Sequence, residues 1–257
     1  MRALIKEFFQ RALKLGTVLQ DRYEIKSYIG RGSYGMVYLA YDLDSQTTVI
    51  VKQNRVRRGK NTRSMLAKEA RTLTNLSHPS IPKYLNFFDE GESSFLVMEY
   101  IDGKNFEDLV INEGKKYEEK ESLYILLKVL RIVKYLHDNK LIHRDLRLPN
   151  IISNNNEIYI IDFGLAVPPE SKAVLLVNSN NALFREPSFN SDFYALGHFI
   201  LFLLYSNYQP TTKIERSWEE ELTISGDTRA LIKRMLRLEG SYEHIEDVLI
   251  DVENCLS

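Results

Sequence analysis

The chain has 257 residues, which is enough for one or two compact lobes. Hydrophobic residues make up 44% and charged residues 27%, an ordinary globular composition that excludes a largely disordered chain. The net charge of -1 gives no basic excess that would indicate a nucleic-acid-binding protein. The single cysteine, Cys255, excludes a disulfide-stapled secreted scaffold and favours a reducing, cytoplasmic compartment.

The apolar segments predict a soluble protein without a transmembrane segment. The longest of them, residues 193–205, is interrupted by Gly197 and His198 and is too short to cross a bilayer, so it predicts a buried helix. At the N-terminus, residues 1–15 place apolar side chains at helical spacing among charged ones. Two interpretations of this predicted helix stay open: it packs on the following domain, or residues 2–15 contact a membrane surface or a partner.

Residues 20–100 read as short strands around one helix, because runs of β-branched and aromatic residues alternate with Gly and Asp. The helix ends where His78-Pro79 follows it. The predicted strands span residues 23–29, 37–41, 48–51, 84–88 and 95–99, and the helix spans residues 62–76.

After residue 105 the pattern becomes mostly helical. Leucine and valine at spacings of three and four predict a long core helix over residues 123–136. A short buried strand is predicted at residues 158–161, and further helices at residues 191–205, 228–238 and 245–255. The pattern changes near residues 101–104, and clefts between domains are favoured ligand sites.

A glycine-rich loop and a lysine provide the first chemical signal. Gly30, Gly32 and Gly35 form a G-x-G-x-x-G sequence between two predicted strands, whereas a dinucleotide fingerprint would open into a helix. Glycines at such positions let backbone N–H groups approach phosphate oxygens. Lys52 ends the next strand pattern, where its ammonium needs an anion, and Glu69 on the following helix can supply a carboxylate.

Three polar residues later in the chain are spaced for phosphate chemistry. Asp145 and Asn150 lie in the sequence His-Arg-Asp-Leu-Arg-Leu-Pro-Asn, and Asp162 follows a buried strand and precedes Phe163-Gly164. The Asp162 carboxylate, at the end of a strand, is a hard-oxygen ligand suited to Mg²⁺, and the Asn150 side chain offers a second oxygen. Asp145 is then free to accept a hydroxyl proton.

These motifs, in this order, resemble those of the eukaryotic-like (Hanks-type) protein kinases, over about residues 20–255. The resemblance implies an α+β, bilobal fold with a small β-rich N-terminal lobe and a larger, mainly helical C-terminal lobe. It divides the chain into an N-terminal helix or extension and a kinase domain with a short hinge. The implied bounds are 1–19 for the extension, 20–257 for the kinase domain, about 20–100 for the N-lobe, about 99–104 for the hinge and about 105–257 for the C-lobe.

The resemblance also implies roles by position. Asp145 matches the catalytic base, with Lys52 and Arg147 assisting the transfer, and Asn150 and Asp162 match the Mg²⁺ ligands. Most members of the family carry lysine where Arg147 stands, and the change makes hydroxyl specificity less secure. The implied nucleotide-binding residues are Gly30, Gly32, Gly35, Val37, Lys52, Glu69, Met98, Glu99 and Ile101.

The segment between Asp162 and Asp192 departs from the family pattern. Asp192 matches the buried helix aspartate that steadies the catalytic loop, yet it lies only 30 residues after Asp162. The nearest match to the family's Ala-Pro-Glu is residues 185–187, which sit too close to Asp192, and the late arginine that pairs with that glutamate is replaced by residues 239–244. We therefore expect both partners of this ion pair to be lost together, because one charge buried alone would be costly.

The shortened segment leads to a hypothesis about regulation. We expect reduced dependence on loop phosphorylation and unusual substrate docking. Obligatory phosphorylation at Ser171, Ser179 or Ser188 would refute this hypothesis.

The function that the resemblance implies is transfer of the γ-phosphoryl group of ATP to protein serine or threonine hydroxyls. ATP and Mg²⁺, or Mn²⁺ in its place, are the expected cofactors, and protein substrates are the expected partners. Three alternatives stay open: a Bud32-like atypical kinase or ATPase within a complex, a pseudokinase acting as a nucleotide-binding module, and a small-molecule phosphotransferase. Bud32-like proteins typically have glycine where Arg144 stands, which favours the first interpretation.

Overall fold

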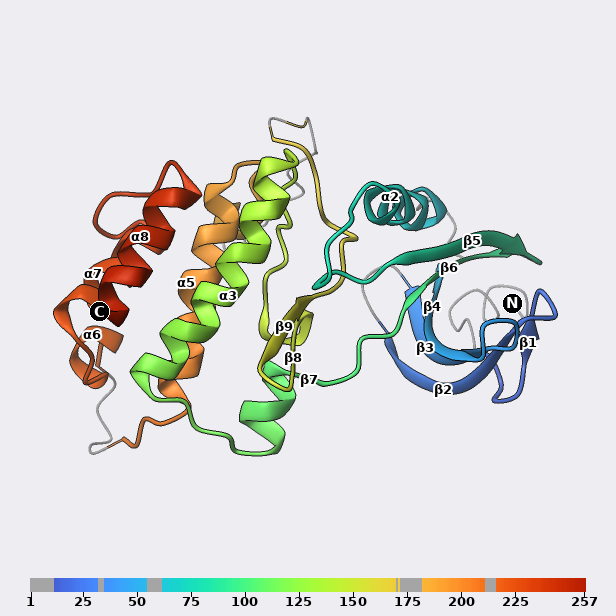
Figure 1. Ribbon diagram of the computed structural model, residues 1–257, viewed down its shortest axis with the longest axis horizontal. Coiled ribbons are helices and arrows are strands. Elements are labelled where there is room, and N and C mark those ends of the chain that lie inside the picture. Colours follow the sequence, from blue (N-terminus) through green and yellow to red (C-terminus); the bar gives the residue numbers. More distant parts are fainter. Residues whose placement is uncertain (1–11, 32–34, 55–61, 170, 172–181, 211–215) are drawn as a thin grey trace, which may run out of the picture. The chain divides into compact units, whose positions relative to one another are not determined.

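The computed structural model describes residues 12–31, 35–54, 62–169, 171, 182–210 and 216–257. The chain divides into two compact units, residues 1–102 and 103–257 (Figure 1). The division falls inside the segment, residues 101–104, where the sequence pattern changes from strands to helices.

In the part of it that the structure describes, the N-terminal unit is a six-stranded sheet with one helix packed on it. All pairs are antiparallel, and the strand order is β1-β2-β3-β4-β6-β5. Helix α2 contacts β4, β5 and β6. The bounds are β1 (Val18–Leu19), β2 (Tyr23–Arg31), β3 (Gly35–Asp42), β4 (Thr47–Asn54), α2 (Thr62–Thr74), β5 (Tyr84–Glu90) and β6 (Ser93–Glu99).

The register of the central strands separates the two faces of this sheet. Val37 pairs with Lys52, and Lys52 pairs with Leu96 on the next strand. Two residues along, Ile50 pairs with Met98 in the same way. Because residues paired across strands share a face, these side chains lie on one side of the sheet. The alternate residues point to the opposite side.

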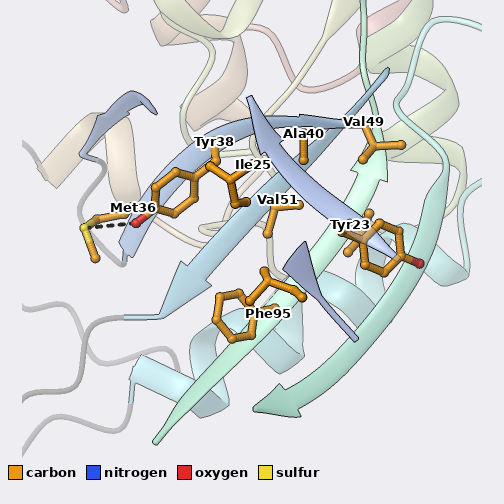
Figure 2. Packing of buried hydrophobic residues seen from close by; sticks show 10 residues of the cluster. Tyr23, Ile25, Met36, Tyr38, Ala40, Val49, Val51 and Phe95 are labelled. Carbon is orange, nitrogen blue, oxygen red and sulfur yellow. Dashed lines mark hydrogen bonds between the residues drawn. The ribbon is translucent and has the colours of Figure 1, made fainter. Parts of the chain in front are cut away.

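That opposite side packs a hydrophobic cluster, shown in Figure 2. Tyr38 lies in the cluster and donates a hydrogen bond to Gln53 Oε1 at 2.9 Å, which satisfies its buried hydroxyl. The cluster consists of Leu19, Tyr23, Ile25, Met36, Tyr38, Ala40, Val49, Val51, Phe95 and Val97.

The N-terminal extension meets this cluster without forming a helix in its described part. Residues 12–17 are irregular or turn, so the predicted helix is wrong for residues 12–15. Leu13 packs against the cluster, and its backbone N–H donates to the Tyr38 hydroxyl at 3.1 Å. These contacts hold Leu13 against the face of the sheet that carries the cluster. Residues 1–11 of the predicted helix lie outside the described residues.

The C-terminal unit is mainly helical, with a small antiparallel sheet in the order β7-β8-β9. Helix α3 packs against α5 and α8, and α7 packs against α5 and α8 (Figure 1). The bounds are β7 (Lys104–Asn105), a π-helical turn (Asp108–Asn112), α3 (Glu119–Asp138), a 3-10 turn (Leu148–Asn150), β8 (Ile151–Asn154), β9 (Glu157–Ile160), α4 (Ala182–Arg185), α5 (Asn190–Tyr205), α6 (Trp218–Glu221), α7 (Gly226–Met235) and α8 (Ile245–Leu256).

The centre of this unit is the buried contact of α3 with α5. Leu126 and Leu130 of α3 are fully buried, as are Leu196 and Ile200 of α5, so the apolar spacing that predicts both helices also builds their interface. Among the described residues, none of the helices is both long and apolar enough to span a membrane.

Candidate active site

Lys52 and Glu69 form an ion pair in the N-terminal unit. Lys52 Nζ lies 2.5 Å from Glu69 Oε1, and the two side chains are 14% and 4% exposed. Lys52 reaches from the sheet face that carries Val37 and Ile50, and Glu69 comes from the buried side of α2. Because a buried charge without a partner is costly, each residue needs the other. The structure thus brings together two residues that the sequence predicts as a pair.

The N-terminal end of α2 is fixed to the sheet by polar contacts. Arg63 donates two hydrogen bonds to the Asp89 carboxylate of β5, at 3.1 and 2.7 Å. Asn54, the last residue of β4, donates to the Thr62 hydroxyl at 3.5 Å. These contacts fix where α2 starts and therefore which of its residues meets Lys52.

Several of the predicted nucleotide-binding residues of this unit, among them Val37, Lys52 and Met98, lie on one face of the sheet. Val37 is half-buried, Met98 is buried, and Glu99 and Ile101 stand at and beyond the end of β6. Half-buried apolar side chains on a sheet face suit the flat ring of a base.

The first and last loop glycines, Gly30 and Gly35, differ in what surrounds them. A Cβ on Gly35 would stand 1.9 Å from the carbonyl oxygen of Gln53, so glycine is needed there for β3 to approach β4. A Cβ on Gly30 would meet no atom of the described residues within 4 Å. Gly32 lies outside the described residues.

In the C-terminal unit, Asp192 of α5 binds the loop that carries Asp145. Its carboxylate is fully buried and accepts backbone N–H groups of His143 at 2.9 Å and Arg144 at 2.8 Å. His137 Nε2 lies 3.0 Å from the same carboxylate. Arg144 has φ = +65°, an uncommon conformation for a residue with a Cβ. The two backbone bonds hold this strained turn in place, as the resemblance implies for Asp192.

His143 supports the same loop from inside. Its ring is fully buried, contacts the Phe163 ring at a centroid distance of 4.8 Å, and places Nε2 3.2 Å from the Ile161 carbonyl. Burial lowers the pKa of His143. A neutral ring therefore links the loop that carries Asp145 to Ile161, the residue before Asp162.

The Asp145 carboxylate is surrounded by hydrogen-bond donors. Arg147 binds it through Nε to Oδ1 at 2.8 Å and Nη2 to Oδ2 at 3.2 Å. Asn150 Nδ2 donates to Oδ2 and to the backbone carbonyl of Asp145, both at 2.9 Å. Hydrogen bonding to Asp145 raises the pKa of Arg147 above its ordinary value. The structure therefore joins Asp145, Arg147 and Asn150 as predicted.

Asn150 and Asp162 lie on neighbouring stretches of backbone. Ile161 N–H donates to the Asn150 carbonyl at 3.0 Å, and Asp162 follows directly with φ = +65°. The Asn150 amide nitrogen is occupied by Asp145, so the amide oxygen remains for a cation. No group of three or more His, Cys, Asp or Glu side chains suited to a metal occurs among the described residues. One carboxylate and one amide oxygen fit Mg²⁺, which takes few protein ligands alongside phosphate oxygens.

A contact that the sequence does not predict involves Arg185 of α4. Its Nη2 donates to Asp145 Oδ1 at 3.1 Å, and its carbonyl accepts a hydrogen bond from Arg144 Nη2. No spacing signal indicates this residue. The sequence offers one clue: Arg185 precedes Glu186, which is the nearest match to the glutamate of the family's Ala-Pro-Glu motif.

The predicted loss of the Glu–Arg ion pair is wrong. Glu186 forms an ion pair with Arg237, which follows α7. The sequence points to residues 239–244 for the missing arginine, but Arg237 stands two residues earlier, at φ = +59°. The shortened segment therefore keeps this ion pair by using an arginine at a different position in the chain.

Known proteins are similar to this chain in sequence over most of its length. Residues 23–241 match the protein kinase domain family. The probable serine/threonine-protein kinase YbdM of Bacillus subtilis is 34% identical over 260 residues, which cover 100% of this chain and 98% of that protein. Serine/threonine-protein kinase B of Synechocystis is 27% identical over 270 residues, covering 91% of this chain and 47% of that protein.

Coverage differs among these relatives. Serine/threonine-protein kinase PrkC of Bacillus subtilis is 28% identical over 209 residues, covering 76% of this chain but 32% of that protein. The chain thus spans nearly all of YbdM and less than half of the other two proteins. Together with the β-rich and helical units, these matches confirm the predicted kinase-like α+β fold and enzyme class. The chain belongs to the protein kinase domain family, whose members use ATP and Mg²⁺ to phosphorylate proteins.

Proposed function

We propose that this chain transfers the γ-phosphoryl group of ATP to serine or threonine hydroxyls of proteins, with Lys52 and Asp145 acting on the same ATP molecule. The observation that carries the proposal is that, within each unit, the candidate residues are in contact with their expected partners. Lys52 is paired with Glu69 in one unit, and Asp145 is joined to Asn150 and anchored through Asp192 in the other. The names of the bacterial relatives support serine/threonine specificity.

The reaction requires a proton acceptor beside the attacking oxygen. The Asp145 carboxylate orients the substrate hydroxyl and accepts its proton as that oxygen forms a bond to the γ-phosphorus. The bond from phosphorus to the ADP oxygen breaks in the same displacement. Arg147 lies beside Asp145 through two hydrogen bonds and brings positive charge to the γ-phosphate.

Binding of the nucleotide uses the other predicted residues. Lys52 would bind the α- and β-phosphates, and Val37, Met98 and the backbone at Glu99 and Ile101 would hold the adenine. Asn150 and Asp162 would hold Mg²⁺, which neutralises charge on the phosphate oxygens when bound. Mn²⁺ would serve in the same place.

The test is phosphoryl transfer from labelled ATP with Mg²⁺ to a generic acceptor protein, followed by mass spectrometry of the labelled residues. Asp145→Asn and Lys52→Ala should each lower the rate by about 100-fold or more, because one removes the proton acceptor and the other a phosphate ligand. Matched controls are Asp138→Asn and Lys104→Ala, at side chains 58% and 60% exposed. Both should stay within about twofold of wild type.

Two results would contradict the proposal. Equal labelling by wild type, Asp145→Asn and Lys52→Ala would overturn the residue roles. Label found on tyrosine alone would overturn serine/threonine specificity.

A further inference from the structure

The Asp145 carboxylate has no acceptor position left for a substrate hydroxyl. A carboxylate offers about four lone-pair sites. Among the described residues, Oδ1 accepts from Arg147 and Arg185, and Oδ2 accepts from Arg147 and Asn150. A serine hydroxyl must bind this carboxylate before its proton can move. One donor therefore has to leave when a substrate arrives.

Arg185 is the donor whose departure breaks the fewest contacts. Arg147 holds the carboxylate by two bonds, and Asn150 donates to both the side chain and the backbone carbonyl of Asp145. Within the described part of the chain, the Arg185 guanidinium makes one hydrogen bond to this carboxylate, at 3.1 Å. Its side chain is 29% exposed, so it can turn toward solvent, whereas Asn150 is buried.

The backbone at Arg185 is fixed although its guanidinium is held by one bond. Its carbonyl accepts a hydrogen bond from Arg144, and the next residue, Glu186, forms the ion pair with Arg237. The guanidinium can therefore leave Asp145 by side-chain rotation while α4 keeps its place. Without an anion to receive it, this charge would leave the carboxylate for water and lose a charge-assisted hydrogen bond.

We infer that Arg185 determines substrate specificity: it occupies the hydroxyl's place on Asp145 and is drawn away by an acidic side chain next to the acceptor serine or threonine. This inference rests on the proposed function. An acceptor with an acidic neighbour supplies both the hydroxyl for Asp145 and the carboxylate for Arg185. An acceptor with neutral neighbours leaves Arg185 in competition with the hydroxyl.

The geometry limits where the acidic residue stands. Arg185 Nη2 lies 3.1 Å from Asp145 Oδ1. The acceptor oxygen of the substrate must come within hydrogen-bond distance of the same carboxylate, so Arg185 Nη2 and the acceptor oxygen are within about 6 Å of each other. An extended chain advances about 3.4 Å per residue. The acidic side chain should therefore lie one or two residues from the acceptor.

The test compares three serine peptides that differ only at the positions one and two residues from the acceptor, which carry Glu, Gln or Lys. For wild type, kcat/KM should be at least about tenfold higher for the Glu peptide than for the Gln peptide, as expected for one charge-assisted hydrogen bond. Arg185→Ala should bring this ratio to about 1, by raising KM for the Glu peptide and raising kcat/KM for the Gln peptide. Arg185→Lys keeps the charge and should retain part of the preference.

The matched control is Arg131→Ala, at a side chain of α3 that is 65% exposed, which should keep the wild-type ratio. The comparison in wild type needs no variant, so the absence of a Glu preference there would refute the inference even if Arg185→Ala fails to fold, and Arg185→Lys would then test the residue itself. Equal kcat/KM for all three peptides in wild type would overturn the inference alone. So would an equal loss on all peptides in Arg185→Ala, because that is the result of a structural role. If wild type phosphorylates neither itself nor any peptide, the proposed function fails and the inference with it.

Discussion

The buried side chain of His143, two residues before Asp145, makes the folding stability depend on pH. Its pKa is lowered by burial, so the unfolded chain binds a proton more readily than the folded one below the ordinary value of 6.5. Stability is then fully present above pH 6.5 and falls as the pH drops below it. His78 and His198 are shifted in the same direction by burial.

We predict that the free energy of unfolding decreases between pH 7.5 and pH 5.5, and that His143→Gln lessens the decrease. One proton contributes at most about 1.4 kcal/mol per pH unit. Carboxylates with lowered pKa, such as Asp42, have an ordinary value of 3.8 and titrate below this window. Urea unfolding of both proteins at three pH values measures the slopes, and identical slopes would contradict the account.

Single residues differ in how far the sequence determines their roles. The roles proposed for Lys52, Asp145, Asn150 and Asp162 follow from sequence motifs, and the structure shows the contacts of Lys52 with Glu69 and of Asp145 with Asn150. Arg185 is not predictable, because its contact with Asp145 spans 40 residues and depends on where α4 packs. Local spacing carries no information on such a contact.

Among the elements, the close pairing of β3 with β4 depends on Gly35, a glycine that the sequence pattern assigns to a phosphate-binding loop. Gly35 pairs with Asn54 at the point where the two strands meet closely. A methyl group there would lie 1.9 Å from the Gln53 carbonyl oxygen, whereas at Gly30 it would meet no atom of the described residues within 4 Å. Neither glycine has a positive φ, so the difference between them is one of space.

We predict that Gly35→Ala lowers the free energy of unfolding by about 2 kcal/mol, because β3 must move away from β4. Gly30→Ala, the matched control, should change it by less than about 0.5 kcal/mol. Thermal unfolding of the two variants beside wild type makes the comparison. Equal midpoints would show that the strands separate without cost and would contradict this interpretation.

Element prediction succeeds where a pattern is long enough to repeat. Helices α3, α5, α7 and α8 and strands β2 to β6 lie close to their predicted ranges, since several turns or alternations define each one. Strands β1, β7 and β8 and helices α4 and α6 were not predicted. With two to four residues each, they form because neighbouring chain offers hydrogen bonds, and not because of a periodic pattern.

For the whole molecule, the proposal places one ATP in contact with residues of both units. Lys52 and the sheet face belong to residues 1–102, and Asp145, Asn150 and Asp162 belong to residues 103–257. In this proposal one unit supplies Lys52 as a phosphate ligand, and the other supplies Asp145 as the proton acceptor and Asn150 and Asp162 as the Mg²⁺ ligands. Nucleotide binding should therefore change both units at once, and loss of a ligand in one unit should abolish the change in the other.

Hydrogen exchange with and without Mg²⁺ and a non-hydrolysable ATP analogue tests this claim most directly. We predict slower exchange in β3 and β4 of the N-terminal unit and in residues 145–164 of the C-terminal unit, with both effects lost together in Lys52→Ala. Protection confined to one unit, or protection of residues 145–164 that survives in Lys52→Ala, would contradict it.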